Sequence, residues 1–201
     1  MRTNKTITNV LFALITVFST VAVANEIYIE QVGDGSTITA TQEGTGNKIG
    51  DSLSPVYIGS GSNTVSIEQI GANNELAMVV NGASTNVTSS VTGSGNLQEI
   101  QCGTTNSAGC SGSTITQTIT GDDNIVKQLL GSGANHTSNI TVAGDTNTIT
   151  HTSTASGTTS ADVTVTGNLN TVSVTQSGMT TQSVSVTSTG NSGNITINQS
   201  N

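Results

Sequence analysis

The 201-residue chain is poor in the side chains that build globular cores. Aromatic residues make up 2% of it, there is no tryptophan, and charged residues make up 8%. Large apolar side chains supply most of the free energy that folds a globular domain, so an ordinary globular core is not expected. Such a composition would suggest disorder if the sequence had no regular pattern.

Positive charge is also scarce, and half of it lies near the start of the chain. Arg2 and Lys5 precede an apolar run over 10–23, and Ala22-Val23-Ala24 is a small-residue cleavage signal. Residues 1–24 are therefore predicted to be a secretory signal peptide, cleaved after Ala24, which implies an extracellular destination. Residues 25–201 then carry two lysines against 12 carboxylates, a net charge of −10. That charge argues against nucleic acid, an anionic membrane surface and membrane insertion after cleavage.

A short phrase instead recurs along residues 25–201. It consists of a glycine, two further residues and Asn or Ser, followed by residues in which Ile or Val occupies every second position. In the second half of the chain the unit is 23 residues long, as in Gly121, Gly144, Gly167 and Gly190. A fixed period of this size is typical of a repeat architecture. It indicates a structural protein.

The residues between the glycines have the pattern of half-buried strands. In residues 63–69, Val65 and Ile67 share a face with Asn63 and Gln69, while Thr and Ser alternate with them. Strands of about six residues ending at Gly-x-x-Asn corners give a unit of about 22–23 residues. The predicted fold is all-β: a narrow β-solenoid with two facing parallel sheets, about eight rungs and about 40 Å long. The predicted turn glycines are Gly33, Gly44, Gly71, Gly93, Gly121, Gly144, Gly167 and Gly190.

Two stretches interrupt the repeat and are predicted to be loop insertions, near 51–62 and near 102–112. The first contains Pro55, the single proline, and the second contains both cysteines, Cys102 and Cys110. A disulfide closing a small surface loop fits a secreted chain. Two cysteines without a nearby histidine are too few ligands for a metal site. Free thiols remain an alternative in a compartment that is not oxidising.

Residues 27–36, 42–47 and 65–74 resemble the curlin repeats of bacterial curli fibres, in which Ser or Asn, apolar residues, Gln, Gly and Asn recur at this spacing. The resemblance extends, more loosely, over most of 25–201, although the cysteine loop departs from it. It implies a β-solenoid that stacks end to end into amyloid-like surface fibres of a biofilm matrix. It also implies that the stacking ladder consists of Gln31, Gln42, Gln69, Gln176, Gln199, Asn47, Asn63, Asn74, Asn124, Asn147 and Asn170.

Catalysis is not expected. His136 and His151 do not form a metalloprotease motif, and no serine nucleophile has triad partners placed with it. Asp122, Asp123 and Asp145 fall at corners and are interpreted as solvated turn residues, with a loose Ca²⁺ site as the alternative. No catalytic residue, cofactor or metal ligand is therefore assigned.

Rows of threonine define another alternative function. They occur at Thr37, Thr39, Thr41; Thr114, Thr116, Thr118, Thr120; and Thr148, Thr150, Thr152, Thr154. Such rows resemble those of ice-binding proteins, although threonine also simply suits a solvated strand face. A fibre or tail component of a phage-like assembly is a third possibility, which a cleaved signal peptide disfavours.

The sequence thus favours a secreted fibre subunit for adhesion, aggregation and biofilm. The predicted partner is a further copy of the chain, joined through the terminal rungs, together with a nucleator subunit and secretion machinery. The terminal rungs are expected to expose unpaired N–H and C=O groups, since no helix or charged cap is evident.

Overall fold

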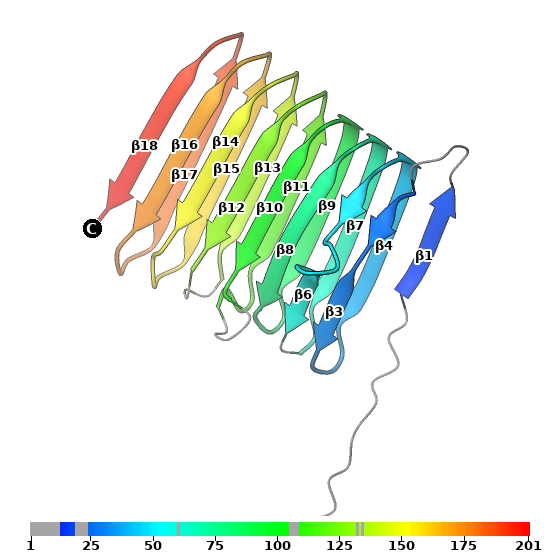
Figure 1. Ribbon diagram of the computed structural model, residues 1–201. Helices are drawn as coiled ribbons and strands as arrows, with labels where there is room; N and C mark the ends of the chain where they lie inside the picture. The colour runs from blue at the N-terminus through cyan, green and yellow to red at the C-terminus, as the bar shows by residue number, and fades with distance from the viewer. Residues whose placement is uncertain (1–12, 19–23, 60, 105–108, 132, 134) are drawn as a thin grey trace, which may run out of the picture.

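The computed structural model describes residues 13–18, 24–59, 61–104, 109–131, 133 and 135–201. In these residues the protein is all-β, and its two parallel sheets lie face to face as a β-solenoid of about seven turns (Figure 1). The predicted fold class is therefore confirmed. Within this part of the chain, no helix is long and apolar enough to cross a membrane.

Two sheets, here called A and B, share the strands. Sheet A contains β1 (Ala13–Phe18), β4 (Thr37–Thr45), β7 (Thr64–Ala72), β9 (Asn86–Ser94), β11 (Thr114–Thr120), β13 (Thr137–Ala143), β15 (Thr159–Thr166) and β17 (Gln182–Thr189), in that order. Sheet B contains β2 (Glu26–Ile27), β3 (Ile29–Val32), β5 (Lys48–Ile49), β6 (Val56–Gly59), β8 (Glu75–Asn81), β10 (Leu97–Cys102), β12 (Ile125–Leu130), β14 (Thr148–Ser153), β16 (Thr171–Ser177) and β18 (Asn194–Ser200). The chain alternates between the sheets, so each turn adds one level to each sheet.

The repeat length sets the register of every pair. Ile115 lies beside Ser138, which is the corresponding residue of the next turn, and Thr64 lies beside Asn86 in the same way. In sheet A two steps are longer because they span the insertions, namely the step from β4 to β7 and the step from β9 to β11. The same insertions lengthen the steps from β3 to β6, from β5 to β8 and from β10 to β12 in sheet B. Constant register keeps the apolar face of each strand directly above that of its neighbour.

The first insertion is smaller than predicted. Val56–Gly59 was expected to lie in a loop, but it forms β6, which pairs with β3 and β8 and buries Val56 and Ile58 completely. The loop is confined to 50–55, where Asp51 Oδ1 accepts the N–H groups of Leu53 and Ser54 at 2.7 Å. At the second insertion, Cys102 is the last residue of β10 and not part of the loop.

The core is the narrow space between the two sheets. Alternate residues point inward, as in β7, where Val65 and Ile67 are 1% exposed while Thr64 and Ser66 face solvent. Two buried clusters, one at each end of the rod, use residues between Ile27 and Ile197. Residues 25–201 therefore contain both of these apolar clusters.

One described strand precedes this core. Residues 13–18, within the predicted signal peptide, form β1, which pairs in parallel with β4 and adds one strand to sheet A. Residues 1–24 were not expected to belong to the fold, so β1 differs from that expectation. The rest of the predicted signal peptide, apart from Ala24, lies outside the described residues, and cleavage after Ala24 stays a prediction.

Candidate assembly site

One corner of the solenoid carries a continuous column of asparagines, the asparagine ladder, which consists of Asn25, Asn47, Asn74, Asn96, Asn124, Asn147 and Asn170. At Asn124 the side-chain Nδ2 donates to Asn96 Oδ1 at 3.0 Å and to the Gly144 carbonyl at 2.8 Å. Its Oδ1 accepts the backbone N–H and the Nδ2 of Asn147 at 2.9 and 3.0 Å. Each internal amide is therefore satisfied by its neighbours, which removes the cost of burying it.

The membership of this column differs from the predicted ladder in three places. The structure brings together Asn47, Asn74, Asn124, Asn147 and Asn170, as the resemblance implied. Asn63 does not belong, because it lies at the opposite corner. Asn25 and Asn96 belong but were not predicted, although Asn96 completes a Gly-x-x-Asn corner that the sequence contains.

The five predicted glutamines do not form a continuous ladder. Gln42 Nε2 donates to Gln69 Oε1 at 2.8 Å in sheet A, and Gln176 Nε2 donates to Gln199 Oε1 at 3.3 Å in sheet B. Gln31 lies beside Ile58 and has no glutamine neighbour. The registers explain this, because Val91 follows Gln69 in its column, while other residues separate Gln31 from Gln176. Four of the five predicted glutamines therefore form two separate pairs, and Gln31 belongs to neither.

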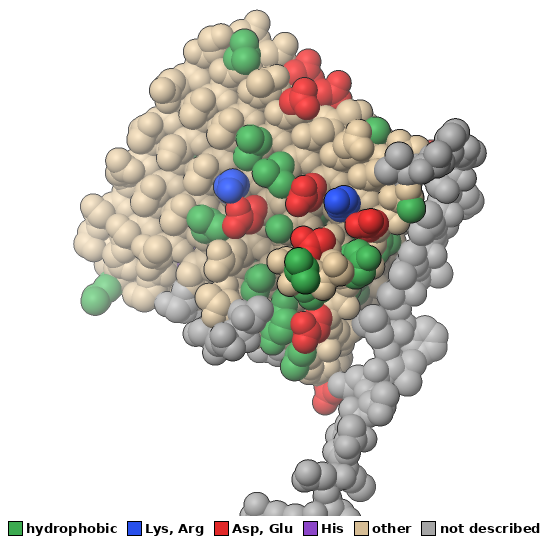
Figure 2. All heavy atoms as spheres, in the orientation of Figure 1, with side chains coloured by type: hydrophobic (Ala, Val, Ile, Leu, Met, Phe, Trp, Pro, Cys, Tyr) green, Lys and Arg blue, Asp and Glu red, His purple; other side chains and the backbone are tan. Residues whose placement is uncertain are grey.

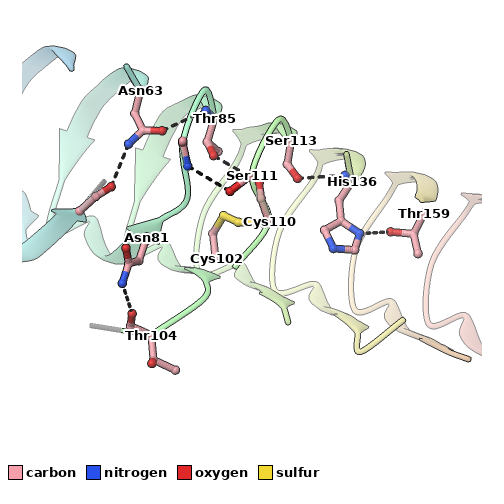
Figure 3. Close-up of a disulfide and its surroundings, with 12 residues drawn as sticks. Asn63, Asn81, Thr85, Cys102, Thr104, Cys110, Ser111, Ser113, His136 and Thr159 are labelled. Atoms are coloured by element: carbon pink, nitrogen blue, oxygen red, sulfur yellow. Dashed lines mark hydrogen bonds between the residues drawn. A yellow bond between two sulfur atoms is a disulfide. The ribbon is translucent and has the colours of Figure 1, made fainter. Parts of the chain in front are cut away.

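The opposite corner carries a mixed polar column that begins with Ser36 and Asn63. Figure 3 shows its members Asn63, Thr85, Ser113, His136 and Thr159. Asn63 Oδ1 accepts the N–H of Thr85 at 2.9 Å, and Ser113 Oγ accepts the N–H of His136 at 2.9 Å. The His136 ring in turn contacts Thr159 through Nδ1. Here the side-chain oxygen of one turn accepts a backbone N–H of the next, so the side chain need not be asparagine.

A disulfide joins Cys102 and Cys110 beside this column (Figure 3). The predicted pairing is thus present, but its surroundings differ from the expected surface loop. Both cysteines are completely buried and belong to the apolar cluster. The disulfide closes the second insertion over the core, where Cys102 takes the inward position that Val80 occupies one turn earlier.

Seven of the eight predicted turn glycines form a column where sheet A strands pass to sheet B. They are Gly44, Gly71, Gly93, Gly121, Gly144, Gly167 and Gly190, all with φ between 102° and 139°. A Cβ on any of the first six would lie 1.9–2.2 Å from the carbonyl oxygen of the next glycine in the column. Only glycine therefore fits these six positions. Gly33 lies at the opposite corner, after β3.

The residue after the corner glycine forms a further ladder that sequence reasoning missed. In this ladder the side-chain Oδ1 of each residue accepts the backbone N–H of the corner residue one turn earlier, at 2.7–2.9 Å. The residues that accept in this way are Asp122, Asp145, Asn168 and Asn191, and the N–H groups belong to Ser94, Asp122, Asp145 and Asn168 in the same order. The regular recurrence of Asp or Asn after the corner glycines was the available signal. Asp122 and Asp145 thus have a structural role at the corner, and no group of three or more His, Cys, Asp or Glu that could hold a metal is found among the described residues.

Both histidines are buried. His151 Nδ1 lies 2.9 Å from Ser138 Oγ, and its Nε2 lies 3.0 Å from Gln176 Oε1. Burial lowers the pKa of His151 and that of His136 below the usual 6.5, because neither cation is solvated there. The Gln176 hydrogen bond partly opposes this shift in pKa at His151, and charge repulsion from His136 adds to it. Each ring is therefore a neutral part of the polar interior at pH 7.

The two ends of the rod have sheet edges. Among the described strands, β17 pairs with β15 alone and β18 pairs with β16 alone. At the other end β2 and β3 form the edge of sheet B, while β1 covers β4 in sheet A. Unpaired strand edges are a template for another strand, because their N–H and C=O groups point outward in register.

The outer faces differ along the rod. Figure 2 shows charged and apolar side chains gathered over one part of the visible face. On sheet B, Lys127 and Glu99 lie side by side on β12 and β10 and form an ion pair at 2.9 Å. Residues 163–201 contain no charged side chain. On sheet A, the outward positions of β9, β11, β13, β15 and β17 are almost all Thr, Ser or Asn, and Asp162 is their one charged side chain.

Comparison with known protein families, curated proteins and solved structures finds no match for this chain.

Proposed function

We propose that the protein is a secreted structural subunit that polymerises into curli-like amyloid surface fibres for adhesion, aggregation and biofilm matrix. The observation that supports this proposal is the uniformity of the rungs. Successive turns are joined by the same parallel backbone pairing and by the same asparagine contacts, for example Asn124 with Asn147 and Asn147 with Asn170. An open edge therefore offers a rung of another molecule the same backbone and side-chain hydrogen-bonding groups that neighbouring rungs offer one another inside the solenoid.

The proposed mechanism is templated strand addition. An incoming molecule pairs its own edge with β17 and β18 and continues both sheets. The edge residues Ile195 and Ile197 are only half-buried, and they become covered when a further rung is added. The partners are further copies of the chain, with a nucleator subunit that starts growth and machinery that secretes the chain. Nucleic acid is not a partner, given the net charge of −10 for residues 25–201.

The test is to incubate purified residues 25–201 at neutral pH and follow thioflavin fluorescence and electron micrographs. A charge placed on the inner face of an edge strand blocks further pairing, so Ile197→Lys is expected to abolish growth. Thr196→Lys is the matched control, because Thr196 lies on the same strand and faces solvent. Unbranched fibres from wild type and Thr196→Lys but not from Ile197→Lys support the proposal, and no fibres from wild type contradicts it.

Salt tests the role of charge in the same assay. The acidic subunits repel one another, so added NaCl is expected to accelerate growth by shortening the Debye length to about 8 Å at 0.15 M. Equal growth rates at low and high salt would refute this part of the mechanism.

The threonine-rich face of sheet A supports a second candidate, a Thr-rich solenoid that binds ice or another ordered surface. From β9 to β17 this face is contiguous, which gives a regular array of hydroxyl groups. An ice-recrystallisation assay distinguishes the two candidates. The surface-binding function would be favoured if the monomer inhibited ice recrystallisation and Thr118→Lys abolished this inhibition. Thr196→Lys, on the other sheet, is the control and should leave the inhibition unchanged.

A further inference from the structure

The two sheets differ in length, and this matters for any end-to-end joint. Within residues 25–201, sheet A has seven levels of one strand each. Sheet B has eight levels, because β2 and β3 share one level, β5 and β6 share the next, and β18 adds a last level that has no counterpart in sheet A. If a second molecule stacked in the same orientation, its β2 and β3 would pair with β18. Sheet A would then lack one strand at every joint, and β17 would keep a row of unpaired backbone groups inside the fibre.

We infer that successive molecules are related by a half-turn about the fibre axis, so that β18 pairs with β4 of the next molecule and β17 pairs with its β2 and β3. This inference rests on the proposed polymerisation and specifies its joint. Sheet A of one molecule then continues as sheet B of the next, and no strand position stays empty. Three features of the two ends support this pairing.

The first feature is a glutamine match. With β18 in register on β4, Ile195 lies beside Ile38, and Gln199 lies beside Gln42. Gln199 accepts from Gln176 and Gln42 donates to Gln69, whereas Gln42 Oε1 is buried without a hydrogen-bond partner. Gln199 Nε2 can donate to that oxygen, and the two separate pairs become one ladder of four amides with the same donor direction throughout.

The second feature is at the mixed polar corner. Gln182 is 1% exposed, and its Oε1 is also buried without a partner. In the same column, the side-chain oxygens of Asn63 and Ser113 accept the backbone N–H of the next turn. The half-turn places Asn25 of the next molecule after Gln182, so the α-amino group of Asn25, which is the first residue after cleavage, can donate in the same way. The joint thus supplies a hydrogen-bond donor to Gln182 Oε1 of one molecule and to Gln42 Oε1 of the next, two buried oxygens that lack one.

The third feature is the unusual corner after β3. Gly33 has φ 113° and Gly35 has φ 77°, which is the geometry of the opposite corner, where Gly190 has φ 113° and Ser192 has φ 59°. The half-turn stacks Gly33 of the next molecule directly on Gly190. The glycine column therefore continues across the joint, whereas same-orientation stacking would place Gly33 beside Asn201.

The strand β1 occupies the edge of β4 that this joint needs, with Val17 in register with Gln42. Growth by the half-turn joint therefore requires that β1 leave β4, and cleavage at the predicted site after Ala24 would achieve this. A fibre end that carries the chain 1–201 is therefore expected to grow through its β4 edge only after residues 1–24 are removed.

Cysteine pairs test the joint in fibres of residues 25–201. In the half-turn joint Asn198 lies beside Thr41, whereas in same-orientation stacking it lies beside Glu30, and all three side chains point outward. Paired strands are about 4.8 Å apart, within the Cα separation that a disulfide bridges. The variants are Asn198→Cys with Thr41→Cys and Asn198→Cys with Glu30→Cys. Asn198→Cys with Thr39→Cys, which is out of register with it, is the control.

Oxidised Asn198→Cys/Thr41→Cys fibres are expected to lose the monomer band on denaturing gels and give a series of oligomers. Cross-linking of the Glu30 pair instead would overturn the half-turn joint and leave polymerisation intact. If wild type forms no fibres, the proposed function itself fails. Gly190→Ala is a second test, since its Cβ has no atom within 4 Å in the monomer but would meet Gly33 in the joint. Normal elongation of wild-type seeds by folded Gly190→Ala would also overturn the inference.

Discussion

A comparison of two glycines in the same column gives a sharp test of how the rungs are held together. At Gly144, φ is 118° and an added Cβ would lie 2.2 Å from the Gly167 carbonyl oxygen. At Gly190, φ is 113° but no atom lies within 4 Å of the added Cβ. Alanine at either position therefore meets similar backbone strain, about 1–3 kcal/mol. Only Gly144→Ala must also displace the next rung.

The displaced carbonyl has a partner, which allows an estimate of the additional loss. Gly167 O accepts from Asn147 Nδ2 at 2.8 Å, and loss of this buried contact costs about 1–3 kcal/mol. Gly144→Ala is thus expected to lower the free energy of unfolding by about 2–6 kcal/mol, the sum of both losses, and Gly190→Ala by about 1–3 kcal/mol, the backbone strain alone.

Urea unfolding of freshly purified monomer, followed by circular dichroism, measures this difference. Because repeat proteins can unfold in parts, hydrogen exchange should also locate the loss in the turns around Gly144. Equal destabilisation by the two variants would refute the conclusion that close carbonyl contact, and not the turn conformation alone, makes the column require glycine.

Three further predictions concern polar groups in the interior. Asn124→Ala removes hydrogen bonds to both neighbouring rungs and should lower stability by about 2–4 kcal/mol, whereas outward-facing Asn139→Ala should change it by less than about 0.5 kcal/mol in the same urea titration. Because the pKa values of His136 and His151 are lowered, the unfolded chain binds more protons than the folded chain as the pH falls below 6.5. The free energy of unfolding is therefore highest above that pH and declines below it, by up to about 1.4 kcal/mol per pH unit for each histidine. A double variant with His136→Gln and His151→Val should lose this pH dependence, and an unchanged pH dependence would contradict the assignment. Gln128 has a buried Oε1 without a partner, and its Nε2 makes a long hydrogen bond of 3.4 Å to the Thr116 carbonyl, so Gln128→Met should raise the urea midpoint by an amount equivalent to about 1 kcal/mol, and a fall would contradict this prediction.

The sequence predicts the repeating architecture well because every strand repeats the same alternation. It fails where two different structural positions share one local pattern. Gly-x-x-Asn marks the corner from sheet A to sheet B, yet Asn63 follows a similar Gly/Ser stretch at the other corner. Deciding between the corners requires a continuous count of strands, and β6 was missed because Pro55 precedes it and Gly59 is its last residue.

The glutamines show a second limit. Gln31 and Gln176 occupy equivalent inward positions, but Ile58 and other apolar or small residues lie between them in the column. A repeated residue type predicts that side chains share a face. It does not predict that they touch, because the longer steps from β3 to β6 and from β10 to β12 shift the alignment that fixed spacing suggests.

In the proposed fibre, the rungs of separate molecules stack along one axis. X-ray diffraction from aligned fibres of residues 25–201 tests it most directly. A meridional reflection at about 4.8 Å is expected, since all strands would lie perpendicular to the fibre axis. A chain that stays monomeric after prolonged incubation with sonicated seeds, or fibres without that meridional reflection, would contradict it.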